Sequence, residues 1–248
     1  MSDSIAIQDA EVKRFRPPES GAPFNAVEDI IYRRRSVRSY LKKQVPEYLV
    51  QRILETGRFA PSSGNVQTWK FIVVQDQKII KNMEDIIVKL FKRIMKFTDY
   101  TKSGSKRKEW FAKVLMRVMP NSFHPVPFWG IKTIANGKMG IWHGAPTVIL
   151  ILADMRAPGH PPVDIGIAGQ NMVLAAHSFG LGTCWVSFCT TPLNMDRKWK
   201  KRMGIKYPYK LVTSIALGYP RGIPDGYIPR ETHAADWYSE DGSFKIIY

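Results

Sequence analysis

The sequence TVILILA at residues 147–153 decides the fold, because an unbroken aliphatic and β-branched run is typical of a strand buried on both faces. The sequence WKFIVVQ at residues 69–75 predicts a second buried strand by the same criterion. Shorter apolar runs at residues 183–188, 211–217 and 244–247 predict three more strands. Helical patterns lie between these runs, and strands that alternate with helices predict a layered domain with a sheet between helices.

Caps and apolar spacing predict the helices around these strands. Residues 25–28 (NAVE) have the spacing of a capping box, and Pro46 suits the first turn of a following helix. Residues 85–97 place apolar side chains on one helical face and basic side chains on the other. Asp164 is predicted to cap a helix that ends at Gly180 and is apolar almost all round. Such a helix is normally buried in a core or at a subunit interface.

The chain is predicted to be one domain preceded by an extended arm. Residues 1–24 contain several prolines and little periodicity, which predicts the arm, and residues 25–248 hold the predicted strands and helices. Residues 98–144 mix Gly, Pro, Trp and Lys with faint periodicity. A long insert inside a compact domain is often a lid or binding loop, so we expect a lid there.

The composition excludes several classes of protein. The chain has 248 residues, of which 44% are hydrophobic and 12% aromatic, so disorder is excluded as the overall state. Its two cysteines, Cys184 and Cys189, form no Cys-x-x-Cys pair, which excludes a disulfide scaffold and suits a reducing compartment. The longest apolar run has nine residues, too few for a membrane span, and the N-terminus lacks a secretory pattern. We therefore expect a cytoplasmic protein.

The positive charge of the chain is large and local. Lys and Arg number 37 against 21 Asp and Glu, a formal charge of +16, and the excess lies in residues 33–43, 92–117 and 197–210. Residues 194–203 are predicted to form a short basic helix. None of the basic segments has zinc-ligand spacing, heptads or a ribonucleoprotein motif, so a nucleic-acid partner is not favoured. Contact of residues 85–97 with an anionic membrane is a less favoured alternative to a lid or surface helix.

The sequence lacks the common nucleotide and metal motifs but contains an arginine cluster. It has no Gly-x-Gly-x-x-Gly after a strand, no P-loop, and no metal-ligand spacing among its five histidines. Arg34, Arg35, Ser36 and Arg38 offer three guanidiniums and a hydroxyl, which can bind a phosphate. The alternative interpretation is a solvated helix C-terminus, where the helix dipole favours cations.

Three further segments are rich in groups that hold ligands. Residues 60–69 (APSSGNVQTW) carry short hydroxyls and amides that suit a polyhydroxyl chain or a heteroaromatic edge, although ordinary turns use the same residues. Residues 189–192 (CTTP) follow a predicted strand. Residues 218–220 (GYP) precede the pair Pro229 and Arg230. Each segment alone is a weak signal.

Together, and in this order, the four segments resemble the FMN-dependent nitroreductase superfamily. The double signature RRSVR followed by APSSGNVQTW is specific, and residues 164–182 (DIGIAGQNMVLAAHSFGLG) are similar to the central helix of the family. The similarity covers most of the chain but not residues 98–144. Residues 190–194 (TTPLN) and the Gly-Tyr-Pro turn look most like the iodotyrosine-deiodinase-like branch. The resemblance implies an α+β fold of three layers, α/β/α, with a central mixed, largely antiparallel sheet.

The resemblance also implies the cofactor site. Arg38 would lie near N1 and O2 of the flavin, where a guanidinium stabilises the negative charge of the reduced ring. Thr190 and Thr191 would face the N5–O4 edge, and they and Arg38 are the implied catalytic residues. The phosphate would be held by two arginines, a serine and Arg230, and the ring would be covered from the partner subunit. The residues implied to contact FMN are Arg34, Arg35, Ser36, Arg38, Pro61, Ser62, Ser63, Asn65, Gln67, Cys189, Thr190, Thr191 and Arg230.

The implied function is that of an FMN-dependent oxidoreductase of the nitroreductase type. NAD(P)H would reduce the enzyme and leave, and a small acceptor would then bind at the same face in a ping-pong cycle. The acceptor would be a nitroaromatic, quinone, enone or halo-aromatic compound. The resemblance implies a homodimer with FMN at the interface and no metal. The alternative is a flavin-binding or flavin-consuming protein of the same fold without nitroreductase turnover.

Overall fold

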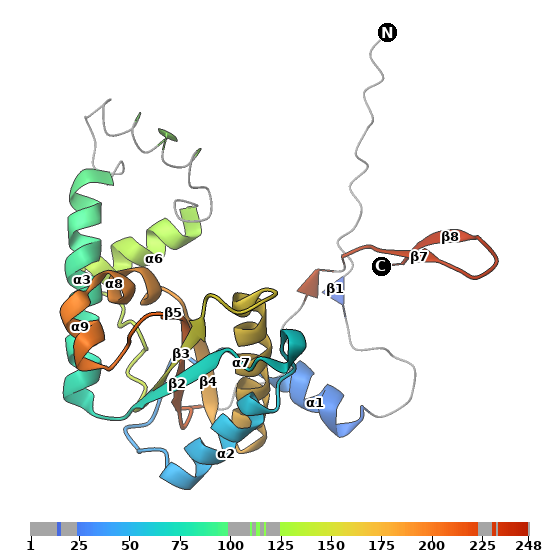
Figure 1. Cartoon of the computed structure of the whole chain (residues 1–248), viewed down its shortest axis with the longest axis horizontal. Helices are drawn as coiled ribbons and strands as arrows, with labels where there is room; N and C mark the ends of the chain where they lie inside the picture. The colour runs from blue at the N-terminus through green and yellow to red at the C-terminus, as the bar shows by residue number, and fades with distance from the viewer. Residues whose placement is uncertain are drawn as a thin grey trace. The chain divides into compact units, whose positions relative to one another are not determined.

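The computed structural model describes residues 14–15, 24–98, 110, 113–114, 117, 125–222, 230–231 and 233–247 (Figure 1). It divides into two compact units, residues 1–33 with 225–248 and residues 34–224. The larger unit is built on a four-stranded sheet in the order β2-β3-β5-β4, with every neighbouring pair antiparallel. The strands are β2 Trp69–Val74, β3 Thr147–Asp154, β4 Gly182–Val186 and β5 Tyr209–Gly218.

A parallel bridge between Ser36 and Thr183 extends this sheet beyond β4. The sheet is therefore mixed and largely antiparallel, which confirms the predicted class. The strands predicted at residues 69–75, 147–153, 183–188 and 211–217 correspond to β2, β3, β4 and β5 within two residues at each end. Strand ends are set by hydrogen bonds with neighbouring strands, which a local pattern does not contain.

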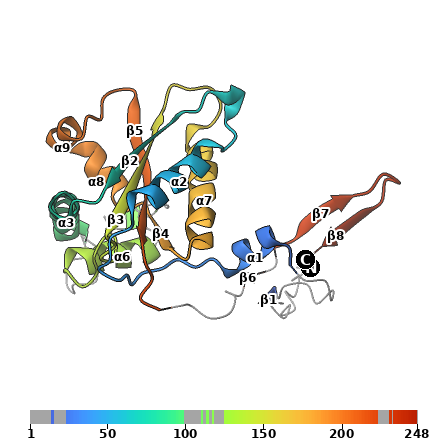
Figure 2. The same cartoon turned by 90° about the horizontal axis from the view of Figure 1, so that it is seen from below.

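Alternating side chains of β3 contribute to two separate cores. Leu150 and Leu152 belong to the core on one face of the sheet, and Ile149 and Ile151 belong to the core on the other. Helices cover both faces, which gives three layers (Figure 2). The helices over the second core are α2 Glu47–Arg58 and α7 Pro161–Ser178. The helices over the first core are α3 Gln77–Thr98, α6 Pro125–Ala135, α8 Thr190–Met195 and α9 Arg197–Arg202.

The two helical layers differ in charge. We call α3, α6, α8 and α9 the basic layer, because their sequences hold twelve Lys and Arg against two acidic residues. We call α2 and α7 the neutral layer, which holds two arginines against three acidic residues. The positive charge of these helices therefore lies on one face of the sheet. Within the described ranges, no helix is long and apolar enough to cross a bilayer.

Helix α7 starts earlier than the sequence indicated. Asp164 was expected to be the cap, but the helix begins at Pro161 and His160 is its N-cap residue. Proline suits the first helical position because its φ is fixed near the helical value and its missing N–H would have no partner there. Asp164 instead lies in the first turn and is buried.

The segment after β4 also differs from the prediction. Residues 190–195 form helix α8, so the predicted basic helix at 194–203 is divided and its basic part is the shorter α9. Asp196 separates the two helices and caps α9 by accepting a hydrogen bond from Trp199 N at 2.8 Å. Helix α6 lies within the region predicted as a lid, and residues 99–109, 111–112, 115–116 and 118–124 of that region lie outside the described part of the chain.

The described residues of the smaller unit form one helix and two short pairs of strands. Helix α1 Ala26–Arg33 begins at the predicted capping box: Asn25 Oδ1 accepts from Val27 N and Glu28 N, and Glu28 Oε2 accepts from Asn25 N. Strand β1 Arg14–Phe15 pairs with β6 Arg230–Glu231, and β7 Ala235–Tyr238 pairs with β8 Phe244–Ile247. The last strand was predicted at these residues.

Candidate functional site

The arginine segment is fixed along the outer edge of β4. Val37 N donates a hydrogen bond to Thr183 O at 2.8 Å, next to the parallel bridge made by Ser36. A Cβ at Gly182 would lie 2.7 Å from Val37 Cγ2, so only glycine at this position lets the segment come so close. The backbone that carries the arginines therefore extends the sheet beyond β4, as a short additional strand would.

The end of the same segment is held by the turn after β5. Leu41 N donates to Tyr219 O at 2.9 Å, and Arg221 N donates to Ser39 O at 3.0 Å. Tyr40 is buried, and its hydroxyl donates to Val37 O at 2.7 Å. Burial raises the pKa of Tyr40 well above its usual value, so this hydroxyl keeps its proton. Tyr40 is a positioning residue that the sequence analysis missed.

The side chains of the segment face different environments. Arg34, Arg35 and Ser36 are half-buried, whereas Arg38 is exposed. His143 lies near Arg38, and its pKa is lowered by burial first and by the Arg38 charge second. His143 also has a left-handed backbone, with φ at +55°. The sequence analysis passed over His143 because its neighbours Gly144 and Ala145 carry no recognisable motif.

The loop at residues 61–67 is held in a strained turn. Asn65 and Gln67 both have positive φ, at 56° and 52°, a conformation that costs a non-glycine residue on the order of 1–3 kcal/mol. Gln67 N donates to Ser62 Oγ at 2.9 Å, and Gln67 Nε2 donates to Asn65 Oδ1 at 3.2 Å. Ser62 and Ser63 are half-buried, and Pro61, Asn65 and Gln67 are exposed. Strain of this kind is often found at ligand sites.

Residues 189–191, at the start of α8, have distinct surroundings. Cys189 is fully buried, and its Sγ lies 3.3 Å from Ser214 Oγ and 3.4 Å from Val186 O. Burial raises the pKa of Cys189 to about 12, so it is a neutral core thiol. The Thr190 hydroxyl donates to Ser187 O at 2.8 Å, whereas Thr191 is exposed. A flavin contact by Cys189 would therefore have to use its backbone.

The structure does not bring all the predicted residues together within one chain. Residues 34–38 lie beyond β4 at one edge of the sheet, whereas residues 61–67 precede β2 at the opposite edge. Four strand spacings of about 4.8 Å separate the two edges by roughly 19 Å. Arg230 is in β6, which belongs to the smaller unit.

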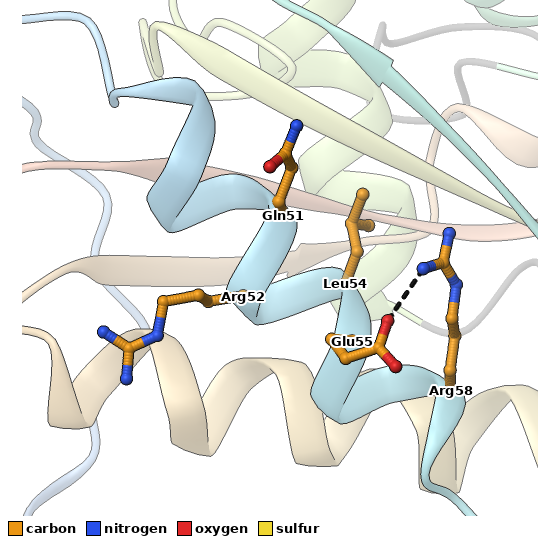
Figure 3. Close-up of a pocket in the computed structure, with 5 residues that line it drawn as sticks. All are labelled: Gln51, Arg52, Leu54, Glu55 and Arg58. Carbon is orange, nitrogen blue, oxygen red and sulfur yellow. Dashed lines mark hydrogen bonds and ion pairs between the residues drawn. The ribbon is translucent and has the colours of Figure 1, made fainter.

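Two hollows of the larger unit lie on the neutral layer. Figure 3 shows one on α2, where Arg58 Nη1 donates to Glu55 Oε2 at 2.8 Å. It is lined by Gln51, Arg52, Leu54, Glu55 and Arg58. A second hollow opens between α2 and α7 and is lined in part by Phe59 and Phe179. Neither contains a residue of the predicted cofactor site. In the part of the chain that the structure describes, no group of His, Cys, Asp and Glu is arranged to hold a metal.

Comparison with known proteins gives one consistent result. Residues 31–219 match the model of the family described as the nitroreductase family. A provisionally named NADH dehydrogenase/NAD(P)H nitroreductase of Archaeoglobus fulgidus is 25% identical over 202 residues, which cover 80% of this chain and 87% of the relative. Human iodotyrosine deiodinase 1 is 26% identical over 203 residues, 77% of this chain and 60% of that protein.

A solved structure supports the same conclusion for the fold. A nitroreductase from Desulfitobacterium hafniense, solved with bound FMN, superposes with a TM-score of 0.60 at 22% identity and covers 84% of this chain and 96% of that chain. The likeness confirms the α+β fold. The predicted resemblance is confirmed as well, since relatives named nitroreductase and relatives named iodotyrosine deiodinase both match.

Proposed function

The chain belongs to the nitroreductase family, and from this premise we propose that it is an FMN-dependent oxidoreductase that takes electrons from NAD(P)H and passes them to a small acceptor. The observation that carries the proposal is the arginine segment. Two adjacent half-buried guanidiniums and a hydroxyl, Arg34, Arg35 and Ser36, stand on a backbone that is hydrogen-bonded to β4. Donors held in place in this way fit a phosphate group, because little side-chain and backbone freedom is lost on binding.

Residues 34–38 and residues 61–67 lie at opposite edges of the sheet, and this separation supports a homodimer. A site that includes both residues 34–38 and residues 61–67 needs two chains, since one chain holds them at opposite edges of its sheet. The neutral layer offers a surface for the partner: Val163 and Ile167 on α7 are 57% and 36% exposed, and Phe59 at the end of α2 is 80% exposed. Exposed apolar patches of this kind mark interaction sites.

Different residues of the chain would bind the phosphate, place a charge beside the flavin ring and cover the ring. Bound FMN would supply the redox chemistry, and the protein would supply position and charge. Arg34, Arg35 and Ser36 would hold the phosphate, and the phosphate contact that the resemblance implies for Arg230 stays a prediction. Arg38 would place its positive charge beside the ring, where it favours the reduced, negatively charged form. Ser62, Ser63 and Asn65 would come from the partner.

The two threonines after β4 are not equivalent in this proposal. The Thr190 hydroxyl proton is already used in a hydrogen bond to Ser187 O, so this hydroxyl is available only as an acceptor. Thr191 is exposed and lies in the first turn of α8. We therefore assign Thr191 the donor role at the flavin edge. Substitution of Thr191 by Val should change the reduction potential more than the same change at Thr190.

The names of relatives support the reductant and the acceptor class. The Archaeoglobus relative is named for NAD(P)H and for nitro compounds, and the human relative is named for an iodinated aromatic amino acid. Nitroaromatic, quinone, enone and halo-aromatic compounds therefore form the panel to be tried. Residues 98–144, where the sequence predicts a lid, would be the source of selectivity among these acceptors.

The proposal is tested by titrating FMN into the apoprotein and following flavin fluorescence. Arg35→Ala should weaken FMN binding about tenfold to a hundredfold, because loss of a charge-assisted donor costs about 1.5–3 kcal/mol. Arg93→Ala is the matched control, since Arg93 is an exposed arginine on α3, away from both the arginine segment and the neutral layer. NADH and NADPH are then added without oxygen. Bleaching of the bound flavin supports the oxidoreductase, binding without bleaching by either supports the alternative flavin-binding protein, and failure to bind FMN contradicts both.

A further inference from the structure

The outer surface of the basic layer carries many exposed basic side chains, and none of them belongs to the proposed FMN site. Helices α3 and α9 lie at the same flank of the larger unit in both views (Figures 1 and 2), and α8 packs against both of them. Ten of the twelve Lys and Arg residues of this layer are exposed. They are Lys78, Lys81, Lys89, Lys92, Arg93, Lys96, Arg197, Lys198, Lys201 and Arg202.

Each of the two helices is oriented with its basic side outward by a buried apolar anchor. On α3, Ile87, Phe91 and Met95 are buried in the core, so the lysines at the intervening positions face solvent. On α9, Trp199 is buried among five basic residues. The apolar face of α3 is therefore already occupied and does not insert into a membrane. A partner must be recognised by the charged face.

The length of this basic surface indicates a partner that is larger than a small anion. Helix α3 has 22 residues and is about 33 Å long at 1.5 Å per residue. Its C-terminal half, from Lys89 to Lys96, carries four bases and no acid. The flavin phosphate or a nucleotide would occupy a small part of this length. An extended anionic surface would occupy all of it.

We propose that the basic layer docks the protein on a bilayer that contains anionic lipids. Nine of its twelve basic residues are lysine, a flexible point charge that suits a diffuse anionic surface, whereas nucleic-acid readout favours the planar fork of arginine. Helices α6 and α8 both pack against α3 and expose Trp129 and Met195, at 67% and 66%. Exposed Trp next to lysines is typical of residues that contact the headgroup region. The attachment is peripheral and does not depend on the proposed enzymatic function.

Co-sedimentation with lipid vesicles tests this proposal. The FMN-loaded protein is mixed with vesicles of phosphatidylcholine alone or with phosphatidylglycerol added, at low and at high salt. The expected result is binding only to the anionic vesicles and release by salt. The two test variants are Lys92→Gln with Lys96→Gln on α3 and Lys198→Gln with Lys201→Gln on α9. Each should lower the partition coefficient about twentyfold to thirtyfold, roughly fivefold for each charge removed.

A matched variant separates the docking surface from net charge. Arg52→Gln with Arg58→Gln removes two charges from the neutral layer and should change the partition coefficient less than about threefold. Thermal unfolding of each variant shows whether it is folded. The proposal is overturned if the wild type binds both vesicle types equally or neither, or if the neutral-layer variant loses as much binding. It is also overturned if a nucleic-acid duplex binds this face more tightly than the anionic vesicles do.

Discussion

The neutral and basic layers cover the same sheet, but they are held in place by different interactions. In the neutral layer, two helical glycines make room for large side chains: a Cβ at Gly57 would lie 2.7 Å from Met172 Sδ, and one at Gly169 would lie 2.2 Å from the ring of Trp185. In the basic layer, long side chains such as Phe91 and Trp199 fill the space between helix and sheet. Helix α7 is therefore held by side chains seated against glycines, and the inward-facing Phe91 and Trp199 leave the outer faces of α3 and α9 to charged residues.

The helices of the two layers also differ in how their N-termini are capped. Asp76 Oδ1 accepts from Lys78 N at 2.7 Å at the start of α3, and Asp196 caps α9. In contrast, the N-cap residues of α2 and α7 are Pro46 and His160, and neither N-cap side chain makes a capping hydrogen bond. Helices that carry many cations gain from an acidic N-cap, because the carboxylate offsets both the helix dipole and the surrounding charge. Helices held by close packing need this less.

The largest effect is expected from a charge on the outer face of the neutral layer. Ile167→Glu should raise the dissociation constant of the proposed dimer by about a hundredfold, because burial of an unpaired carboxylate costs about 3 kcal/mol or more. Sedimentation velocity over a range of protein concentrations measures this constant. FMN should be lost together with the dimer, since the proposed site needs both chains.

The control for this change lies in the other layer. Met195→Glu introduces the same charge at an exposed apolar residue of the basic layer and should leave the dimer unchanged. If Ile167→Glu forms as tight a dimer as the wild type, the outer face of α7 is not the interface. A dimer broken by Met195→Glu and kept by Ile167→Glu would reverse the roles assigned to the two layers.

A smaller effect, on stability, is expected where α7 touches the sheet. Gly169→Ala should lower the free energy of unfolding by about 1–3 kcal/mol, because the Trp185 ring must move from a packed position. Urea unfolding at a fixed protein concentration measures the change. Combining it with Trp185→Phe should recover most of the loss, since the shorter ring no longer reaches the new methyl group. Additive losses in the double variant would show that this contact does not limit the packing.

The sequence contained most of the information for the sheet. The aliphatic run at residues 147–153 predicted a strand buried on both faces, and β3 is one. The start of α7 was predicted too late, because Asp164 has the chemistry of a cap but two prolines before it already have helical φ. Helix α8 was missed because six residues are too few to show helical periodicity.

The candidate site was predictable only in part, for a geometric reason. The residue types in segments 34–38 and 61–67 indicated a phosphate and a polyhydroxyl ligand, but a sequence does not show that these segments end at opposite edges of one sheet. Tyr40 and His143 were missed because their roles depend on contacts with Val37 and Arg38 in the folded chain. The one-sided distribution of charge also appears only after folding, since α3 and α9 are about a hundred residues apart in the sequence.

The smallest effect is expected at the cap of α9. Asp196→Ala should lower the free energy of unfolding by about 1 kcal/mol, because Trp199 N loses its acceptor and five cations lose a nearby carboxylate. His160→Ala at the start of α7 is the matched variant and should change it by less than about 0.5 kcal/mol, since His160 makes no capping hydrogen bond. Added salt should recover part of the loss at Asp196, because it screens the repulsion among the α9 bases. Equal losses at the two caps, measured by urea unfolding, would mean that the layers do not differ in how their helices are held.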